Sequence, residues 1–184
     1  MNRNHIAVII LIIIFAGFME LNMDRTLIYK YGPVRLWSGD INSNQNSQQI
    51  ADPYTFTHII HGFGFYALAS LIPTPLSLGT RAIIAIAGES LWEVIENTDM
   101  VINRYRAATI SLDYYGDSVI NSVFDILAAL LGFWIASRVR IIWTIVLMIV
   151  IEVILLLWIR DSLVVNIIML LYPISAIKIW QAGL

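Results

Sequence analysis

The stretch "RAIIAIAGESLWEVIENTD", residues 81–99, joins an apolar run to four carboxylates with no turn signal between them. Glu89, Glu93 and Glu96 stand at positions i, i+4 and i+7, which share one face of a helix. An ionisable side chain is costly in the hydrocarbon of a membrane, so such residues turn toward a polar partner or a wet cavity. The stretch therefore predicts a membrane helix whose acidic face lines an interior pocket.

The composition of the whole chain is that of an integral membrane protein. Of its 184 residues, 59% are hydrophobic and only 13% are charged, whereas an ordinary soluble domain is about half apolar and about a quarter charged. The net charge is −2 and no run of like charges occurs, so no nucleic-acid partner is expected. Cysteine is absent, which excludes disulfides and thiolate ligands or nucleophiles.

Apolar segments near the ~20 residues that a helix needs to cross a bilayer recur along the chain. One polar segment, residues 22–53, is long enough for an extramembrane loop but too short for a domain. The sequence therefore predicts an all-α, polytopic transmembrane helical bundle of about six helices, forming a single domain over residues 1–184. The expected spans lie near residues 6–21, 54–72, 82–97, 117–136, 141–159 and 162–180.

Orientation is predicted from the basic residues between spans, because these stay mainly in the cytoplasm. Their numbers are nearly equal on the two sides, so the count alone does not decide. Arg138 and Arg140, however, form a short unpaired cluster of the cytoplasmic kind. The pattern favours a cytoplasmic location for both termini.

Two further helices carry polar stripes toward the end of the bundle where residues 81–99 end. His58 and His61, at i and i+3, lie near the start of the second span. Asp117, Asn121 and Asp125 step by four from the start of the fourth span. Because successive spans alternate in direction, all these residues fall on one side of the bilayer. We therefore expect a polar intramembrane pocket toward one face.

Histidines and carboxylates from several helices form a ligand set used for zinc and for two-metal sites in helical bundles. On this first hypothesis the cofactor is a divalent metal such as zinc. Its expected ligands are His58, His61, Glu93 and Asp125.

A second hypothesis needs no metal, because a buried carboxylate beside a histidine forms a general acid and base. An arginine near such a pair would hold a phosphate or carboxylate by two parallel hydrogen bonds. The candidate catalytic residues are Glu93, Glu96, His61 and Asp117. The candidate substrate-binding residues are Arg104, Arg106, Asn121 and Arg160.

A structural interpretation competes with both hypotheses. The arginines would then pair with the acids, and Asn121 and Asn166 would link helices, which is the commoner role of asparagine in membranes. Glu20, at the end of the first span, is expected to be solvated.

Three long runs of the chain closely resemble the UPF0314 family, also called DUF2585. They are "NSQQIADPYTFTHIIHGFGFY", "WEVIENTDMVINRYRAATISLDYYGDSVINSVFD" and "IRDSLVVNIIMLLYP". The resemblance covers nearly the whole chain beyond the first span. It implies a multi-pass protein of the bacterial inner membrane, in a family whose name denotes unknown function.

A weaker resemblance reaches the VanZ-like membrane proteins, whose helices carry His, then Glu, then an Arg to Asp to Asn run. The matching residues here are His58 or His61, Glu93, Arg106, Asp117 and Asn121. Where that pattern continues with small residues, this chain has Phe124 and Asp125. The resemblance implies a role in the cell envelope and no catalytic assignment.

The leading functional prediction is a membrane-embedded hydrolase or transferase acting on a lipid or lipid-linked envelope substrate. A small proton- or cation-coupled carrier is the alternative from another class, and an accessory structural subunit of a membrane complex is a third. A carrier needs a polar path to both faces, yet Glu152 is the only acid placed deeper than the cluster. This one-sidedness favours the enzyme.

Overall fold

The computed structural model describes residues 1–109 and 113–183, and in these residues it is all-helical, with no strands. The predicted all-α class is confirmed, and the expected count of about six helices is approximate. The helices are α1 (Arg3–Asn22), α2 (Thr55–Ser70), α3 (Leu78–Glu96), α4 (Asp99–Ala108), α5 (Val119–Ala136), α6 (Ile141–Ile159), α7 (Leu163–Leu171) and α8 (Ser175–Gln181).

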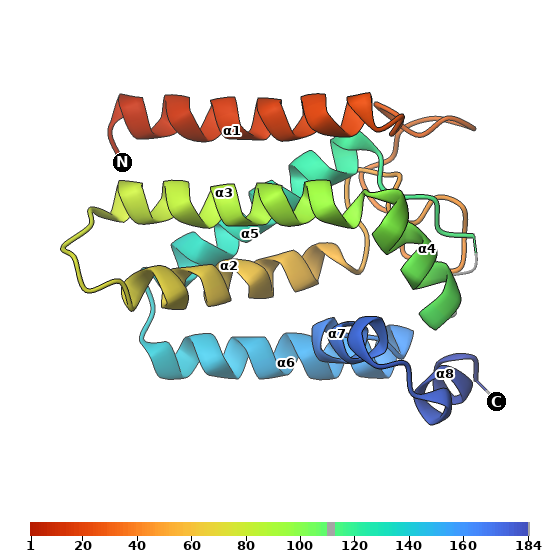
Figure 1. Ribbon diagram of the computed structural model, residues 1–184. Helices are drawn as coiled ribbons and strands as arrows, with labels where there is room; N and C mark the ends of the chain where they lie inside the picture. The colour runs from red at the N-terminus through yellow and green to blue at the C-terminus, as the bar shows by residue number, and fades with distance from the viewer. Residues whose placement is uncertain (110–112, 184) are drawn as a thin grey trace.

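The five long helices α1, α2, α3, α5 and α6 run the length of a bundle and alternate in direction (Figure 1). The N-terminus and the short α2–α3 loop lie at one end. The long loop between α1 and α2, together with α4, α7 and α8, lies at the other (Figure 1). The polar ends of α2, α3 and α5 therefore meet at one end of the bundle, as the sequence predicts.

In the described part of the chain, three helices are long and apolar enough to cross a membrane, namely α1, α5 and α6, with mean hydropathies of 2.2, 2.0 and 2.8. Of these, α6 presents most of its side chains outward, and Leu157 is 82% exposed. An apolar helix with this exposure is stable where lipid covers it. These helices indicate a membrane protein. The expected spans near residues 54–72 and 82–97 correspond to α2 and α3. Neither helix is both long enough and apolar enough, because α2 has only 16 residues and α3 carries three glutamates.

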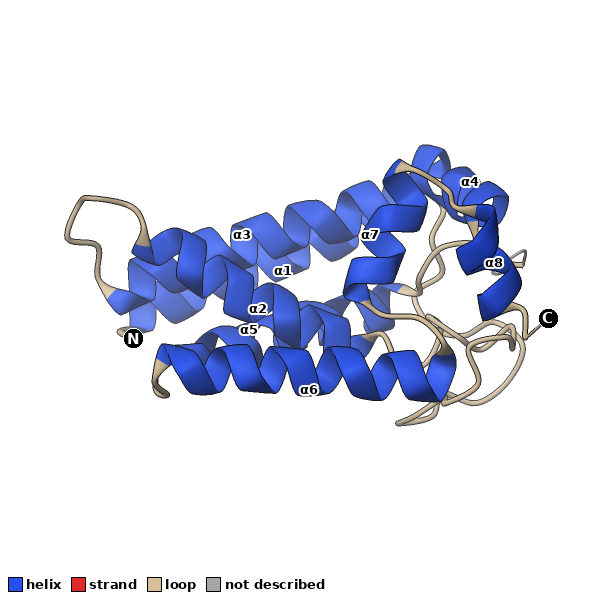
Figure 2. Ribbon diagram, turned by 90° about the horizontal axis from the view of Figure 1, so that it is seen from below, coloured by secondary structure: helices blue, strands red, loops and turns tan. Residues whose placement is uncertain are grey.

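Residues 162–180, expected as one span, form the two short helices α7 and α8 instead. Pro173 separates them, because proline has no backbone N–H and disfavours helical geometry in the residue before it. Tyr172 accordingly has an extended conformation, with φ of −143° and ψ of 89°. Figure 2 shows α7 running from the end of α6 toward α4 rather than back along the bundle. The expectation of both termini on one side rested on this sixth crossing, and the termini lie at opposite ends of the bundle (Figure 1).

The core of the bundle lies between α1, α3 and α5 and combines alanines with isoleucines and a phenylalanine. Ala16, Ala82 and Ala85 are almost fully buried there, beside Ile86 and Ile126. Lipid tails are as apolar as leucine, so membrane helices associate through close packing of such small residues rather than through a hydrophobic driving force. This packing holds α3 and α5 at the spacing that the site requires.

Helices α2 and α5 make the closest approach in the bundle, through one glycine on each. A Cβ at Gly62 would overlap the backbone oxygen of Ala129 and lie 2.6 Å from the backbone nitrogen of Phe133. A Cβ at Gly132 would overlap the backbone oxygen of Ile59. Only glycine fits at either position. The crossing lies one turn from His58 and so places that ring against α5.

The polar loop of residues 23–54 covers the site end of the bundle and is tied to it by hydrogen bonds. The Gln48 side chain donates to the backbone oxygen of Gly116 at 2.7 Å, and Ser118 donates its backbone N–H to Ser47 at 2.9 Å. Ser47 has a positive φ of 58° and donates its own N–H to the buried Asp52 carboxylate at 2.8 Å. The loop is therefore a fixed cap.

Candidate functional site

The centre of the site is a carboxylate held between two histidines. His58 Nδ1 lies 2.6 Å from Glu89 Oε1, and His61 Nδ1 lies 3.1 Å from each Glu89 oxygen. Glu89 is fully buried, His58 is buried and His61 is half-buried. Because i and i+3 share a helix face, α2 presents both rings to the same side chain of α3. The sequence placed Glu89 on the acidic face of α3 but did not select it as a site residue.

Two more buried carboxylates surround His58. Glu93 Oε1 lies 3.1 Å from His58 Nδ1, but that nitrogen is closer to Glu89, so Glu93 Oε1 has no hydrogen-bond partner among the described residues. Asp125 Oδ2 lies 3.9 Å from His58 Nε2, beyond hydrogen-bond distance, and Asp125 Oδ1 is buried with no hydrogen-bond partner in the described part of the chain. Three acids thus face one imidazole. The site has an excess of negative charge that a bound cation or proton would neutralise.

Tyrosines at the outer end of the site hold the remaining acids. The Tyr105 hydroxyl lies 3.0 Å from Glu96 Oε1 and 2.8 Å from Asn166 Oδ1. Tyr54 donates to Asp161 Oδ2 at 3.0 Å. These contacts join α2, α3, α4 and α7 around one space.

Asp117 is fixed by a third tyrosine and by an asparagine. Tyr114 donates to Asp117 Oδ1 at 3.0 Å, and the Asn97 side chain donates to Oδ2 at 3.0 Å. Asn97 also accepts the backbone N–H of Asp117 at 2.7 Å. Asn97 is fully buried at the end of α3 and pins the start of α5 to it. No periodic pattern in the sequence predicts this contact, because the two residues lie in separate loops.

Several of these groups line a cavity of about 450 Å³, a size typical of small-molecule sites. Its polar wall contains His58, His61, Glu96, Asp117, Asp125 and Asp161. Its apolar wall is formed by α2, α6 and α7 and contains Phe65, Leu68, Met148, Ile167 and Leu170. Leu68 is 62% exposed and Ile167 is 47% exposed, so the apolar wall reaches the outer surface of the bundle.

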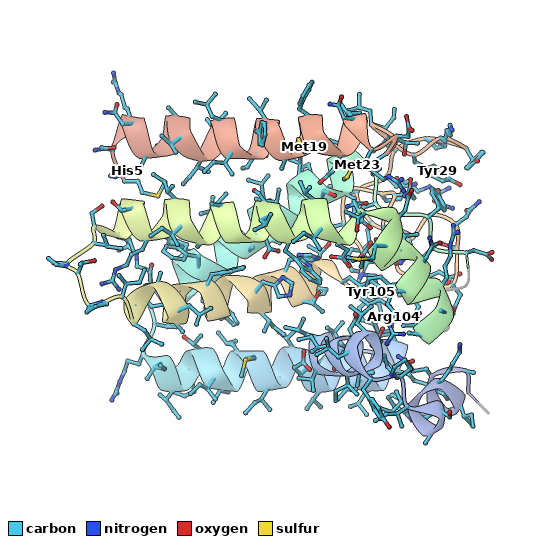
Figure 3. The ribbon with its side chains drawn as sticks, in the orientation of Figure 1. His5, Met19, Met23, Tyr29, Arg104 and Tyr105 are labelled. Atoms are coloured by element: carbon cyan, nitrogen blue, oxygen red, sulfur yellow. The ribbon has the colours of Figure 1, made fainter. Side chains whose placement is uncertain are left out.

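The three arginines expected to bind substrate do not line this cavity. Arg104 reaches from α4 to the end of α7 and donates to the backbone oxygens of Leu170 and Leu171 (Figure 3). Arg106 donates to the backbone oxygen of Tyr114, and Arg160 donates to that of Trp180. Each guanidinium group therefore supports the backbone around the site. Asn121, expected beside them, is buried on α5, and its side-chain nitrogen has no partner within residues 1–109 and 113–183.

Two glutamates, Glu152 and Glu20, lie in environments that differ from those expected from the sequence. Glu152, the acid expected deeper than the cluster, caps α7 by accepting the backbone N–H groups of Leu163 and Val164 at 3.0 and 3.2 Å. Glu20, expected to be solvated, is fully buried, and neither of its carboxylate oxygens has a hydrogen-bond partner among the described residues. Helix α1 packs against α5 at this position, which removes Glu20 from solvent.

Burial raises the pKa of Asp161 to about 6, and the charge on Glu152 acts in the same direction. Hydrogen bonds from Ser162 and Tyr54 oppose this shift. Burial also raises the pKa of Asp117 to about 6. Both carboxyl groups lie outside the three apolar spans, so the outer end of the site changes charge close to neutral pH.

The raised pKa of Asp161 predicts a pH dependence of stability. Because the folded protein holds this proton more tightly than the unfolded chain, the stability contributed by Asp161 falls as pH rises from about 4 through about 6. We expect the melting temperature of the detergent-solubilised protein to fall less over this range in Asp161→Asn than in wild type. Asp40→Asn, in an exposed loop, should keep the wild-type slope. Equal slopes of melting temperature against pH in all three proteins would contradict the assignment of this pH dependence to Asp161.

Comparison with known proteins identifies the family. The family model described as "Protein of unknown function (DUF2585)" matches residues 20–183. This chain belongs to the DUF2585 family. Its relatives include UPF0314 proteins of Sinorhizobium fredii (51% identical, covering 88% of this chain and 82% of the relative) and Paracoccus denitrificans (48%, covering 95% and 90%). A third, from Brucella anthropi, is 45% identical and covers 97% and 91%. No solved structure matches the chain.

The region shared with DUF2585 proteins contains every residue that lines the cavity, from Asn46 to Leu170, and leaves out most of α1. The weaker resemblance to VanZ-like proteins is not shown by these matches. The chemistry of this DUF2585 site is therefore inferred from its own residues.

Proposed function

We propose that the protein is a membrane-embedded, metal-assisted hydrolase or transferase acting on a lipid or lipid-linked substrate. The observation that carries this proposal is a cluster of possible metal ligands at the polar wall of an amphipathic cavity. One nitrogen of His58, one of His61 and one oxygen of Glu89 all lie within 4.8 Å of one another. Two histidines and one glutamate form a ligand set used by catalytic zinc, with a fourth position left for water or substrate.

A second trio, His58, Glu93 and Glu96, also offers one ligand atom from each residue, all within 4.8 Å of one another. We favour the first trio as ligands because it supplies two imidazoles and because Glu89 already lies between them. A divalent metal there would act as a Lewis acid and lower the pKa of a bound water. Asp125, near the other nitrogen of the His58 ring, would then orient that ring.

Glu96 is the general base and acid of this proposal. It lines the cavity, its carboxylate lies within 4.8 Å of His58, and Tyr105 holds it from the other side. Glu96 accepts the proton of the attacking water or hydroxyl as the new bond to carbon or phosphorus forms. It returns that proton to the leaving oxygen as the old bond breaks.

The apolar wall of the cavity supports a lipid substrate. Phe65, Leu68 and Ile167 provide a surface for an acyl or prenyl chain that is continuous with the exterior of the bundle. A carrier would need polar groups along α2, α3 and α5 beyond His61 and Glu89, where residues 62–69, 82–88 and 126–136 include no charged side chain. With the N-terminus in the cytoplasm, the site opens to the outer leaflet of the bacterial inner membrane.

Metal content tests the proposal directly. We expect the detergent-purified wild type to hold about one zinc or similar ion per chain by elemental mass spectrometry, and His58→Ala/His61→Ala to hold less than about a tenth of this. His5→Ala is the matched control, because His5 lies at the opposite end of the bundle from Tyr105 (Figure 3). A wild type that holds no metal, even after incubation with Zn²⁺ or Mn²⁺, would overturn the proposal.

A further inference from the structure

Apart from His58 and His61, the described residues that line the cavity offer no basic side chain to an anionic headgroup. Among the described residues that line it, none is lysine or arginine, while Glu96, Asp117, Asp125 and Asp161 all face it. Arg104, the arginine nearest its outer end along α4, is occupied by backbone oxygens of α7. A substrate with an additional negative charge would meet uncompensated carboxylates, whereas a positive group would be attracted.

Asp125 offers the site that such a positive group would occupy. It is 4% exposed, it lines the cavity, and its Oδ1 has no hydrogen-bond partner among the described residues. A buried, unpartnered carboxylate oxygen is costly unless a donor reaches it. A primary ammonium brings both the charge and N–H donors, whereas a quaternary ammonium brings charge alone.

We propose that the cavity binds a lipid whose headgroup carries a primary ammonium, and that Asp125 Oδ1 accepts a hydrogen bond from that ammonium. The acyl chains lie along Phe65, Leu68 and Ile167, and the ammonium lies against the carboxylates. This inference deepens the proposed function by naming its substrate class and rests on it for the reaction that follows binding. It predicts selectivity by headgroup, independent of metal.

The test is a binding series on the detergent-purified full chain, monitored by native mass spectrometry. The probes are short-chain phosphatidylethanolamine, phosphatidylcholine and phosphatidylglycerol, with free ethanolamine as a fourth. We expect phosphatidylethanolamine to bind at least about tenfold more tightly than the other three. In Asp125→Asn this preference should fall to less than about threefold, and in Asp40→Asn it should persist.

Equal or tighter binding of phosphatidylglycerol would overturn the inference, as would an Asp125→Asn variant with unchanged preference. Free ethanolamine binding as tightly as the lipid would overturn the lipid assignment. The wild-type series alone decides the headgroup class if Asp125→Asn does not fold. Metal content measured on the same preparation separates the two proposals. A metal-free protein that prefers phosphatidylethanolamine contradicts only the metal-assisted reaction. A metal-bound protein that shows no headgroup preference contradicts only this inference.

Discussion

Replacing Gly62 with alanine is expected to destabilise the protein by about 3 kcal/mol or more, because the new methyl group has no space at the α2–α5 crossing. The added Cβ would overlap a backbone oxygen of α5, and a backbone cannot move aside as a flexible side chain can. The helices must separate instead, which carries His58 away from Asp125 and α5. The measurement is the melting temperature of the detergent-solubilised variant, with urea or detergent denaturation for the free energy.

Gly64→Ala is the matched control, since it makes the same change on the same helix two residues away. A Cβ at position 64 meets nothing within 4 Å. Alanine is favoured over glycine in a helix by about 1 kcal/mol, so Gly64→Ala should be neutral or slightly stabilising. Because the two substitutions are expected to change stability in opposite directions, the comparison separates the effect of the α2–α5 crossing from the effect of helix propensity. Similar stabilities would mean that α2 and α5 do not pack as described.

The sequence predicts those parts of the fold and the site that repeat with helical period. The acidic face of α3, the histidine pair of α2 and the stripe that begins at Asp117 are all periodic, and the structure brings them together at one end of the bundle. Which carboxylate lies between the histidines depends on how far α2 slides along α3. That offset is a matter of tertiary packing, such as the fit of Gly62 against α5, which no local pattern encodes.

Contacts made by loops and short helices were beyond prediction for a different reason. Arg104 and Arg160 sit near acids in the sequence, yet both donate to backbone oxygens. Those that Arg104 reaches, on Leu170 and Leu171, lie at the end of α7. Such unsatisfied carbonyls occur at every helix end, but they arise here only because Pro173 divides residues 162–180. The proline was visible in the sequence. Which backbone oxygens the arginine side chains would contact as a result was not visible.

Removing the charge of Glu89 should weaken metal binding by more than about 100-fold, if the two histidines and this glutamate are the ligands. Glu89→Gln keeps the size of the side chain and one carbonyl oxygen, so the hydrogen bonds and packing around it change little. A neutral carboxamide is a far weaker ligand than a carboxylate. The measurement is titration of the metal-stripped protein with Co²⁺, followed by its visible absorption, in wild type and variant.

Glu93→Gln is the matched control for Glu89→Gln, because it removes the same charge one turn further along α3. Both glutamates are buried and both lie close to His58, so a purely electrostatic attraction of the cation would weaken equally in the two variants. Direct ligation predicts a large loss for Glu89→Gln and a loss of about tenfold or less for Glu93→Gln. A larger loss of metal affinity in Glu93→Gln than in Glu89→Gln would assign the metal to the other trio of close ligand atoms, from His58, Glu93 and Glu96. Unchanged affinity in both would mean that the histidines and Glu89 form only a buried hydrogen-bond network, and that the polar end of the cavity binds its substrate without a metal.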